Sequence, residues 1–274
     1  MLNVTPREEP ADCHLLEMPD GAHLLIDAAD GGDAPGTAVA SLQRRGIHHL
    51  ALVVISHFHR DHYGRLLDLV RAGITIDKVW LNVPDPRAAE REKPWGCDWN
   101  DVQSVLAELR ARQIPFATPQ AGDRLYEVQS PDGTVAGLEV LCLYYGVNTP
   151  VGQTDVNDTS IILRVFHGTT RILFTGDLNY ALGAYLAAGN LDLHAALLKV
   201  PHHGTDTVAP NEFFDRVGAQ AAFVPAPRQL WESARSKRVR NYFIEHGTPT
   251  YVSGLCGDVT VTLTAHGYTI ETEH

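Results

Sequence analysis

Cysteines are few in this 274-residue sequence, and long apolar runs are missing from it. The cysteines are widely spaced and form no C-x-x-C pair, which argues against a disulfide framework and against a zinc site built from thiolates. The longest apolar runs, such as residues 50–55, are far shorter than the ~20 residues of a membrane-spanning helix. Residues 1–10 contain neither a basic leader nor an apolar signal segment. We therefore expect a cytoplasmic protein with no membrane partner and with four reduced cysteines, Cys13, Cys97, Cys142 and Cys256.

Basic residues are also scarce. The 22 lysines and arginines stand against 33 aspartates and glutamates, which gives a formal charge of −11 at pH 7. This balance excludes a generally basic nucleic-acid-binding protein. Hydrophobic residues make up 44% of the chain and charged residues 20%, so the chain can bury a large core and global disorder is not expected.

The pattern of apolar runs and turn formers predicts an alternation of strands and helices. Strands are expected at 13–18, 22–27, 50–56, 76–81, 138–144, 160–166, 171–175, 195–200 and 221–224, with two closing strands within 251–273. Helices are expected around residues 38–42 and 66–70, and at 178–188 and 211–217. Residues 84–120 contain five prolines around one amphipathic helix and are interpreted as an insertion in a single domain that spans residues 1–274.

Histidine is abundant, and five of the 14 histidines fall in two clusters. The first cluster, HFHRDH, follows the apolar strand at residues 50–56 and contains His57, His59, Asp61 and His62. In an extended H-x-H segment both rings point to one side, and the following turn can direct the last two residues to a second point nearby. Two adjacent metal sites are therefore feasible, although isolated histidines after a strand are usually ordinary polar loop residues.

Ligand-type residues also follow two later strands. Asp177 ends the segment LFTGD, and His202 and His203 lie in KVPHHG. An aspartate after Thr-Gly is often a turn or helix-capping residue, and one of the two histidines can be structural. Together with the first cluster, however, the three strand ends favour one shared site, because open α/β sheets build their sites at the carboxyl ends of strands.

HFHRDH, TGD and PHHG, in this order, resemble the metal motifs of the metallo-β-lactamase fold superfamily. The resemblance implies an αββα four-layer sandwich, with two mixed β-sheets packed between helices. It also implies that His57 and His59 bind metal one, that Asp61 and His62 bind metal two, and that Asp177 bridges both. One of His202 and His203 would complete metal two. Asp27 resembles the structural aspartate near the start of this fold.

A narrower resemblance connects NDTSIIL, ILFTGDL and LLKVPHHGT to the hydrolase domain of ComEC-type DNA-uptake proteins, and choline-binding phosphorylcholine esterases are similar as well. Most relatives have a histidine at the third motif, where this chain offers Asn157 and Asp158. Asn157 is the favoured ligand because the N-x-x-S spacing matches. Its oxygen is a weaker ligand than an imidazole, so metal one is expected to bind less tightly.

The expected chemistry follows from two divalent cations, with Zn²⁺ favoured and Mn²⁺ or Fe²⁺ compatible with the same ligands. A water between two such ions has its pKa lowered from 15.7 toward ~7, which gives a metal-bridging hydroxide that attacks a phosphoryl or carbonyl centre. Asp61 can take a proton from that water. Whichever of His202 and His203 is not a ligand can contact the leaving group or the substrate.

The leading functional hypothesis is hydrolysis of a phosphodiester or phosphate-bearing substrate by a nuclease or a nucleotide phosphodiesterase. The net charge favours nucleotides over long nucleic acid. Arg235 and Arg238, on an expected helix, are candidate phosphate contacts or part of a solvated face. We expect three tryptophans either to line a substrate cleft or to pack in the core: Trp95, Trp99 and Trp231. The alternatives are hydrolysis of a carboxylic ester, thioester, lactone or β-lactam at the same metals, and a binding module with a degraded site. The oligomeric state is left open.

Overall fold

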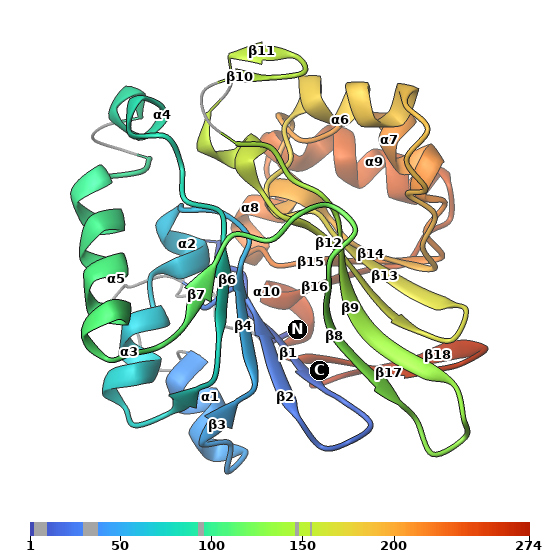
Figure 1. The fold of residues 1–274 in the computed structure, drawn as a ribbon. Coiled ribbons are helices and arrows are strands. Elements are labelled where there is room, and N and C mark those ends of the chain that lie inside the picture. The colour runs from blue at the N-terminus through green and yellow to red at the C-terminus, as the bar shows by residue number, and fades with distance from the viewer. Residues whose placement is uncertain (3–9, 30–37, 93–95, 146–147, 154) are drawn as a thin grey trace.

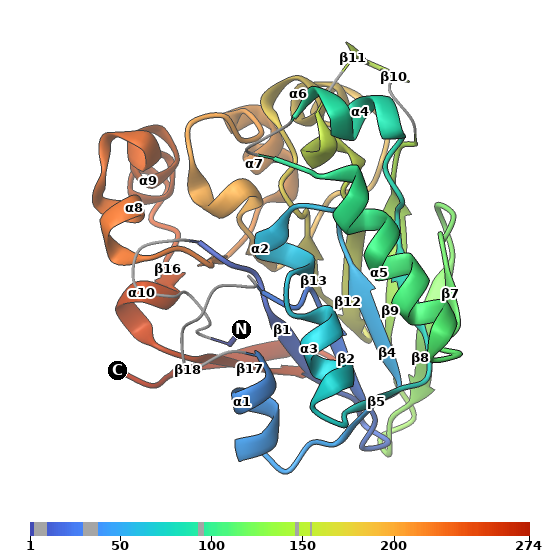
Figure 2. The same cartoon turned by 90° about the vertical axis from the view of Figure 1, so that its left-hand side faces the viewer.

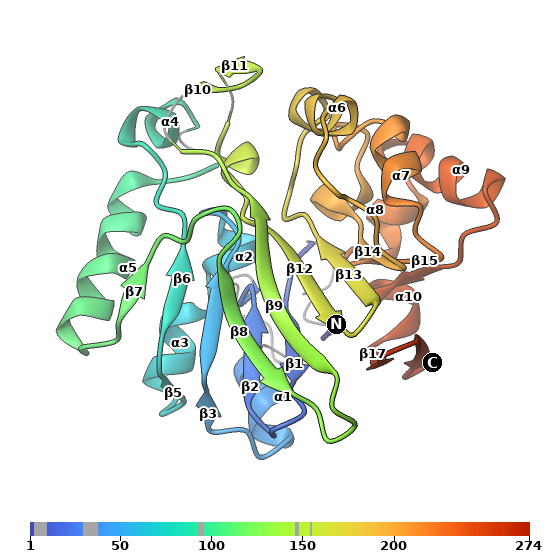
Figure 3. The same cartoon turned by 45° about the vertical axis from the view of Figure 1, so that its right-hand side comes forward.

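Two β-sheets lie face to face between two layers of helices, as the computed structural model shows (Figures 1 and 3). The structure describes residues 1–2, 10–29, 38–92, 96–145, 148–153 and 155–274. Its buried apolar side chains form three clusters, one beneath each helical layer and one between the sheets. The expected αββα sandwich with mixed sheets is therefore confirmed.

The first sheet has the order β1-β2-β4-β6-β7, in which β1 and β2 are antiparallel and the other neighbours are parallel. The strand β4 shows why the sheet is buried on both faces. Val53 and Ile55 pack under the helices, whereas Leu52 and Val54 face the other sheet, because successive side chains of a strand point to opposite faces. The strands are β1 (His14–Glu17), β2 (His23–Ile26), β4 (Leu52–Ile55), β6 (Val79–Leu81) and β7 (Phe116–Ala117).

Helices α1, α3 and α5 cover the outer face of this sheet, and α3 and α5 lie in front of it in Figure 2. Two of the helices in this half begin at aspartate caps: Asp85 accepts a hydrogen bond from the first turn of α4, and Asp98 does so for α5. The helices are α1 (Ala38–Arg44), α2 (Arg60–Tyr63), α3 (Leu66–Arg71), α4 (Pro86–Arg91) and α5 (Trp99–Ala111).

The second sheet has the order β16-β15-β14-β13-β12-β9-β8, parallel from β13 to β16 and antiparallel from β8 to β13. Its strands are β8 (Arg124–Gln129), β9 (Val135–Cys142), β12 (Ile162–His167), β13 (Thr170–Phe174), β14 (Leu197–Lys199), β15 (Ala221–Val224) and β16 (Thr250–Val252). Its helices are α6 (Tyr180–Ala188), α7 (Asn211–Val217), α8 (Arg228–Glu232), α9 (Lys237–Glu245) and α10 (Ser253–Cys256), with 3-10 turns η1 (Val156–Thr159), η2 (Pro201–Gly204) and η3 (Ala234–Ser236).

Three two-stranded pairs complete the described part of the chain: β3 (His49–Leu50) with β5 (Thr75–Ile76), β10 (Asn148–Thr149) with β11 (Gly152–Gln153), and β17 (Val259–Thr264) with β18 (Gly267–Thr272). The last pair is the expected closing hairpin. The backbone nitrogen of Met1 donates to the carbonyl oxygen of Val259, so the first residue lies beside β17. Across the described ranges, no helix has the length and hydropathy needed to cross a membrane.

Several elements differ from the sequence expectations; helices α2, α8 and α10 and strand β7, for example, were not predicted. The edge strand β8 was not predicted, because its side chains are mostly polar and half exposed and give no apolar alternation. Residues 84–120 contain two helices rather than one, since Asp85 and Pro86 begin the short helix α4. The same segment ends in β7, which pairs in parallel with β6, while α5 packs on the first sheet.

Candidate metal centre

The ligand-type residues meet at one end of the two sheets. Asp27 follows β2, and the HFHRDH segment begins two residues after β4 ends at Ile55. Asp177 follows β13, the PHHG turn follows β14, and η1 precedes β12, which is antiparallel to β13. The carboxyl ends of β2, β4, β13 and β14 and the start of β12 therefore supply the side chains of one site, as the strand-end argument predicts.

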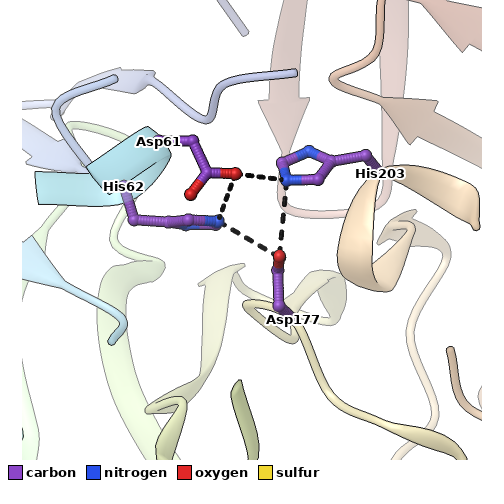
Figure 4. Close-up of side chains that lie close together, drawn as sticks. All are labelled: Asp61, His62, Asp177 and His203. Carbon is purple, nitrogen blue, oxygen red and sulfur yellow. Dashed lines mark hydrogen bonds and ion pairs between the residues drawn. The ribbon is translucent and has the colours of Figure 1, made fainter. Parts of the chain in front are cut away.

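Four of the predicted residues converge on a common centre (Figure 4). Nε2 of His203 lies 2.9 Å from Oδ2 of Asp61 and 3.3 Å from Oδ2 of Asp177. Nε2 of His62 lies 3.2 Å from Oδ1 of Asp177 and 3.8 Å from Oδ2 of Asp61. All four ligand atoms lie within 4.8 Å of one another, and three of the four residues are buried. Two imidazole nitrogens and two carboxylates at this spacing are a ligand set for a divalent cation. We refer to these four residues as the four-residue cluster.

Each histidine of the four-residue cluster is held by a hydrogen bond at its other ring nitrogen. Nδ1 of His62 lies 2.8 Å from Oδ2 of Asp27, and Nδ1 of His203 lies 2.9 Å from the carbonyl oxygen of Pro225. These partners direct both Nε2 atoms toward the carboxylates, as is usual for histidines that bind metals. The resemblance of Asp27 to a structural aspartate agrees with this contact.

The PHHG turn separates the roles of its two histidines. Both adopt left-handed backbone conformations, with φ of 47° at His202 and 55° at His203, and such strain in non-glycine residues is concentrated at functional sites. His203 enters the four-residue cluster, whereas Nε2 of His202 lies 3.9 Å from Oδ2 of Asp177 and its side chain is 24% exposed. Gly204 has no room for a side chain, because a Cβ atom there would lie 2.8 Å from the ring of Trp231.

His57 and His59 lie beside the four-residue cluster. The ring centroids of His57 and His62 are 4.1 Å apart, and those of His57 and His59 are 4.8 Å apart. Nδ1 of His57 lies 3.1 Å from Oγ of Ser56 and 3.3 Å from Oγ of Ser160, while its buried Nε2 makes no hydrogen bond to any described residue. Nε2 of His59 lies 2.7 Å from Oε2 of Glu92, so Nδ1 is the nitrogen left for a cation. Buried polar atoms without a partner need an explanation, and a metal ion supplies one here.

The turn η1 brings Asn157 to the same region. Its Nδ2 lies 3.4 Å from Oδ2 of Asp155, whereas its buried Oδ1 has no hydrogen-bond partner among the described residues. Ser160, the serine of the N-x-x-S spacing, donates through Oγ to the carbonyl oxygen of Asn157 and accepts from the backbone nitrogen of Asp177. Glycine is needed at position 176, because a Cβ atom there would lie 2.4 Å from that Oγ. The neighbouring Asp158 instead accepts from the backbone nitrogen of Asn179.

The charges of the site perturb its titrating groups. Burial by itself lowers the pKa of His62, but the carboxylates of Asp177 and Asp27 outweigh it and raise that pKa well above its usual range. Burial opposes ionisation of Asp177, yet His62 and His203 hold the pKa of its carboxyl well below its usual range. Burial, reinforced by His62, lowers the pKa of His57 well below its usual range. His57 is therefore neutral and its ring nitrogen is available to a cation.

A profile of the metallo-β-lactamase superfamily matches residues 6–224, which is most of the chain. The chain belongs to the metallo-β-lactamase superfamily. The uncharacterized protein YcaI of Escherichia coli (strain K12) is 30% identical over 115 residues, which cover 42% of this chain and only 15% of YcaI.

Two solved structures of low identity share the fold. The metallo-beta-lactamase fold protein YhfI from Bacillus subtilis superposes with a TM-score of 0.52 at 12% identity, covering 98% of this chain and 95% of YhfI. CmlA, a diiron beta-hydroxylase from Streptomyces venezuelae, has the same TM-score and identity and covers 98% of this chain and 55% of its own. At this identity the likeness concerns the superfamily fold alone.

Three charged residues at the candidate metal centre were not found by sequence reasoning. Nζ of Lys199 lies 2.5 Å from Oδ2 of Asp12 and 3.4 Å from Oδ1 of Asp177, and Glu92 contacts His59 as described above. Asp12 and Glu92 carry no local motif, since their partners are far away in the sequence. The strand pattern placed Lys199 at a strand end without indicating its burial, although a buried lysine requires a charged partner.

An open cleft of about 1540 Å³ lies over the candidate metal centre. His59, Asp61, Asn157, Asp158 and His202 are among its lining residues, together with Arg60, Arg71 and Arg91. The cleft exceeds the roughly 300–1000 Å³ that is usual for small-molecule pockets.

The two arginines expected to contact substrate are not part of the cleft wall in the described ranges. Arg238 donates to Oδ1 of Asn211 and to the carbonyl oxygens of Val208 and Ala209, so its guanidinium holds the chain that follows the PHHG turn. Arg235 is exposed elsewhere on the surface. The structure thus gives Arg238 a structural contact in place of the expected one.

The tryptophans also differ in their positions. Trp231 is buried in the core beneath the second helical layer, and Trp99 packs against the core beneath the first. Neither belongs to the described wall of the cleft, which agrees with core packing rather than substrate contact. Trp95 lies outside the described residues.

Proposed function

We propose that this protein is a dinuclear metal-dependent hydrolase of phosphodiesters. The observation that carries the proposal is the four-residue cluster of Asp61, His62, Asp177 and His203, whose ligand atoms lie within 4.8 Å of one another at the edge of an open cleft. A site that had lost its function would not be expected to retain two oriented histidines and two carboxylates in this arrangement.

We propose that the site holds two divalent cations of unequal affinity. The four-residue cluster offers one ion two imidazole nitrogens and two carboxylates. The other ion has three candidate ligands: Nε2 of His57, Nδ1 of His59 and Oδ1 of Asn157, the last a neutral amide oxygen. Asp177 is the candidate bridge between the two ions. Zn²⁺ suits this set best, while Mn²⁺ and Fe²⁺ fit the same ligand types.

When bound, such ions supply Lewis-acid stabilisation of developing negative charge and lower the pKa of water toward ~7. The chain itself supplies proton acceptors and contacts to substrate. Asp61 lines the cleft, and its carboxylate can accept a proton from the attacking water. Burial lowers the pKa of His202, so this half-buried imidazole at the cleft is neutral at pH 7 and can contact the substrate or exchange a proton with the leaving group.

Two observations favour a phosphodiester as the substrate. The motifs NDTSIIL, ILFTGDL and LLKVPHHGT resemble the hydrolase domain of ComEC-type DNA-uptake proteins. The cleft is open, and Arg60 and Arg71 contribute to its wall, where their guanidinium groups, which are paired with Asp101 and Asp68, can also meet phosphate oxygens. Two bound divalent ions would add further positive charge where an anionic substrate sits, despite the net charge of −11.

A substrate panel tests the proposal. Protein loaded with Zn²⁺ or Mn²⁺ is assayed with bis(p-nitrophenyl) phosphate, single-stranded DNA, RNA and cyclic nucleotides, and in parallel with a chromogenic β-lactam and a thioester. We expect hydrolysis of at least one phosphodiester and its loss in the variant Asp177→Asn. Hydrolysis of only the β-lactam or the thioester would show that the protein acts on carbonyl substrates instead of phosphodiesters. If the metal-loaded protein hydrolyses none of the substrates, the proposal is overturned.

A further inference from the structure

Glu92 follows α4, far in the sequence from every metal motif, yet its buried side chain contacts His59. We call His57, His59 and Asn157, the residues proposed to hold the weakly bound ion, the first metal site. Oε2 accepts from Nε2 of His59 at 2.7 Å and from the backbone nitrogen of Cys97 at 3.2 Å. Oε1 accepts from the backbone nitrogen of Val156 at 2.5 Å. The side chain is 4% exposed, so its carboxylate oxygens are almost inaccessible to bulk water.

The three donors belong to three separate segments, and two of these segments carry candidate ligands. His59 is itself one ligand, and Val156 directly precedes Asn157, the ligand that replaces the usual histidine of the third motif. The four-residue cluster has its own orienting contacts, from Asp27 and from Pro225, and does not touch Glu92. The contacts of Glu92 are therefore confined to one half of the metal centre.

We infer that Glu92 is a positioning residue that builds the first metal site, an inference that rests on the proposed function. By accepting a hydrogen bond from Nε2–H, its carboxylate leaves Nδ1 of His59 as the nitrogen that faces the cation. By accepting from Val156, it also fixes the turn that presents Oδ1 of Asn157. Ordering flexible ligands on binding costs free energy, and pre-ordered ligands avoid this cost. A weak site with three ligands therefore depends on such fixation more than the four-residue cluster does.

Only a carboxylate can perform this role at position 92. Among the described residues, three N–H donors point at its two oxygens, and an ionised carboxylate is acceptor-only. In Glu92→Gln, the amide nitrogen would face either Val156 or the pair of Cys97 and His59, so one donor always meets another donor. The variant has nearly the same shape, which makes it a selective probe of the hydrogen-bonding pattern.

Gly96 offers a second, independent probe. A Cβ atom at this position would lie 2.5 Å from Oε2 and 2.7 Å from Cβ of Glu92, so Gly96→Ala must displace the glutamate side chain without removing it. We expect this variant to reproduce the effect of Glu92→Gln. Glu90→Gln, which removes a charge from the exposed side of α4, is the matched control.

The experiment measures zinc binding by competition with a chromophoric chelator, and metal content by elemental analysis after dialysis at fixed free Zn²⁺. We expect the wild-type protein to bind one Zn²⁺ tightly and a second more weakly. In Glu92→Gln and Gly96→Ala, the affinity for the weakly bound ion, at His57, His59 and Asn157, falls by about 10–100-fold, and the affinity for the tightly bound ion is unchanged. Glu90→Gln binds both ions as the wild type does, and an unchanged tight site shows that a variant is folded.

Two outcomes would overturn the inference alone: wild-type affinity for both ions in Glu92→Gln and Gly96→Ala, or an equal loss at both sites in folded variants. Wild-type protein that binds no Zn²⁺ would overturn the proposed function and this inference with it. As a further readout, nitrogen-15 NMR of the zinc-loaded wild type is expected to show the His59 ring protonated at Nε2; a ring protonated at Nδ1 would also contradict the role of Glu92.

Discussion

Lys199 and Asp12 form a buried ion pair behind the metal centre, with Nζ of Lys199 2.5 Å from Oδ2 of Asp12. Each side chain is 1% exposed. The lysine also donates to the carbonyl oxygen of Gly176, and Oδ1 of Asp12 lies 3.5 Å from Nδ1 of His203. The pair therefore places a permanent positive charge among the carboxylates that would hold the cations, and it connects the segment before β1 to the end of β14.

Lys199→Met is predicted to destabilise the metal-free protein. Removing one partner of a buried pair leaves an uncompensated charge, which typically costs about 3–5 kcal/mol. Urea unfolding measures this loss, with Lys237→Met on the surface as the control. In the double variant with Asp12→Asn the total loss is expected to be smaller than the sum of the two single losses, and strict additivity would show that the pair is not coupled.

The two adjacent histidines are predicted to respond differently to alanine substitution. His203→Ala removes a member of the four-residue cluster, so metal content falls by about one ion per chain. His202→Ala keeps both ions, because His202 lies outside the cluster, but slows phosphodiester hydrolysis by about 10²–10⁴-fold if the imidazole exchanges a proton with the leaving group. Metal analysis and kinetic measurements on the same preparations distinguish the roles of the two histidines. Loss of metal in His202→Ala with retention in His203→Ala would reverse the assignment.

Removal of metal is predicted to lower the melting temperature. An ion that binds only the folded state at a free concentration 100 times its dissociation constant stabilises by about 2.7 kcal/mol. For a domain of this size, that corresponds to roughly 5–10 °C. Differential scanning calorimetry with and without a chelator measures the shift. Asp177→Asn should abolish most of it, and an equal shift in that variant would place the stabilising ion elsewhere.

The thiols are predicted to differ in reactivity. Cys13, Cys97 and Cys142 are buried, and burial raises the pKa of Cys97 and of Cys142 to about 12, so both remain protonated at pH 9. Only Cys256 is partly accessible. Ellman's reagent should therefore titrate one thiol in the native protein and four in denaturant, with the native reaction lost in Cys256→Ser. Rapid reaction of more than one native thiol would contradict the described burial.

Local patterns in the sequence predicted most of the fold and the central ligands. The apolar runs predicted α7 and β15 at their observed bounds, because each lies between clear turn signals. The motifs placed the candidate histidine and aspartate ligands at strand ends, because each motif directly follows an apolar run along the chain. Which of His202 and His203 enters the cluster was left open, because the choice depends on two consecutive left-handed residues.

The missing parts of the prediction depend on contacts between distant segments. Glu92 reaches His59 across 33 positions, and Asp12 meets Lys199 across 187 (199 − 12) positions. Neither contact leaves a periodic or local signal. The contacts of Arg238 were missed for a related reason, because a cluster of basic residues does not reveal that backbone carbonyl groups accept hydrogen bonds from one of its guanidinium groups.

The most direct test of the account is the position of bound zinc in crystals of the metal-loaded protein. Anomalous scattering at the zinc edge locates each ion without reference to activity. The account predicts two peaks about 3.5–4 Å apart, the stronger among Asp61, His62, Asp177 and His203 and the weaker beside His57, His59 and Asn157. Metal-loaded crystals without a peak inside the four-residue cluster would contradict it.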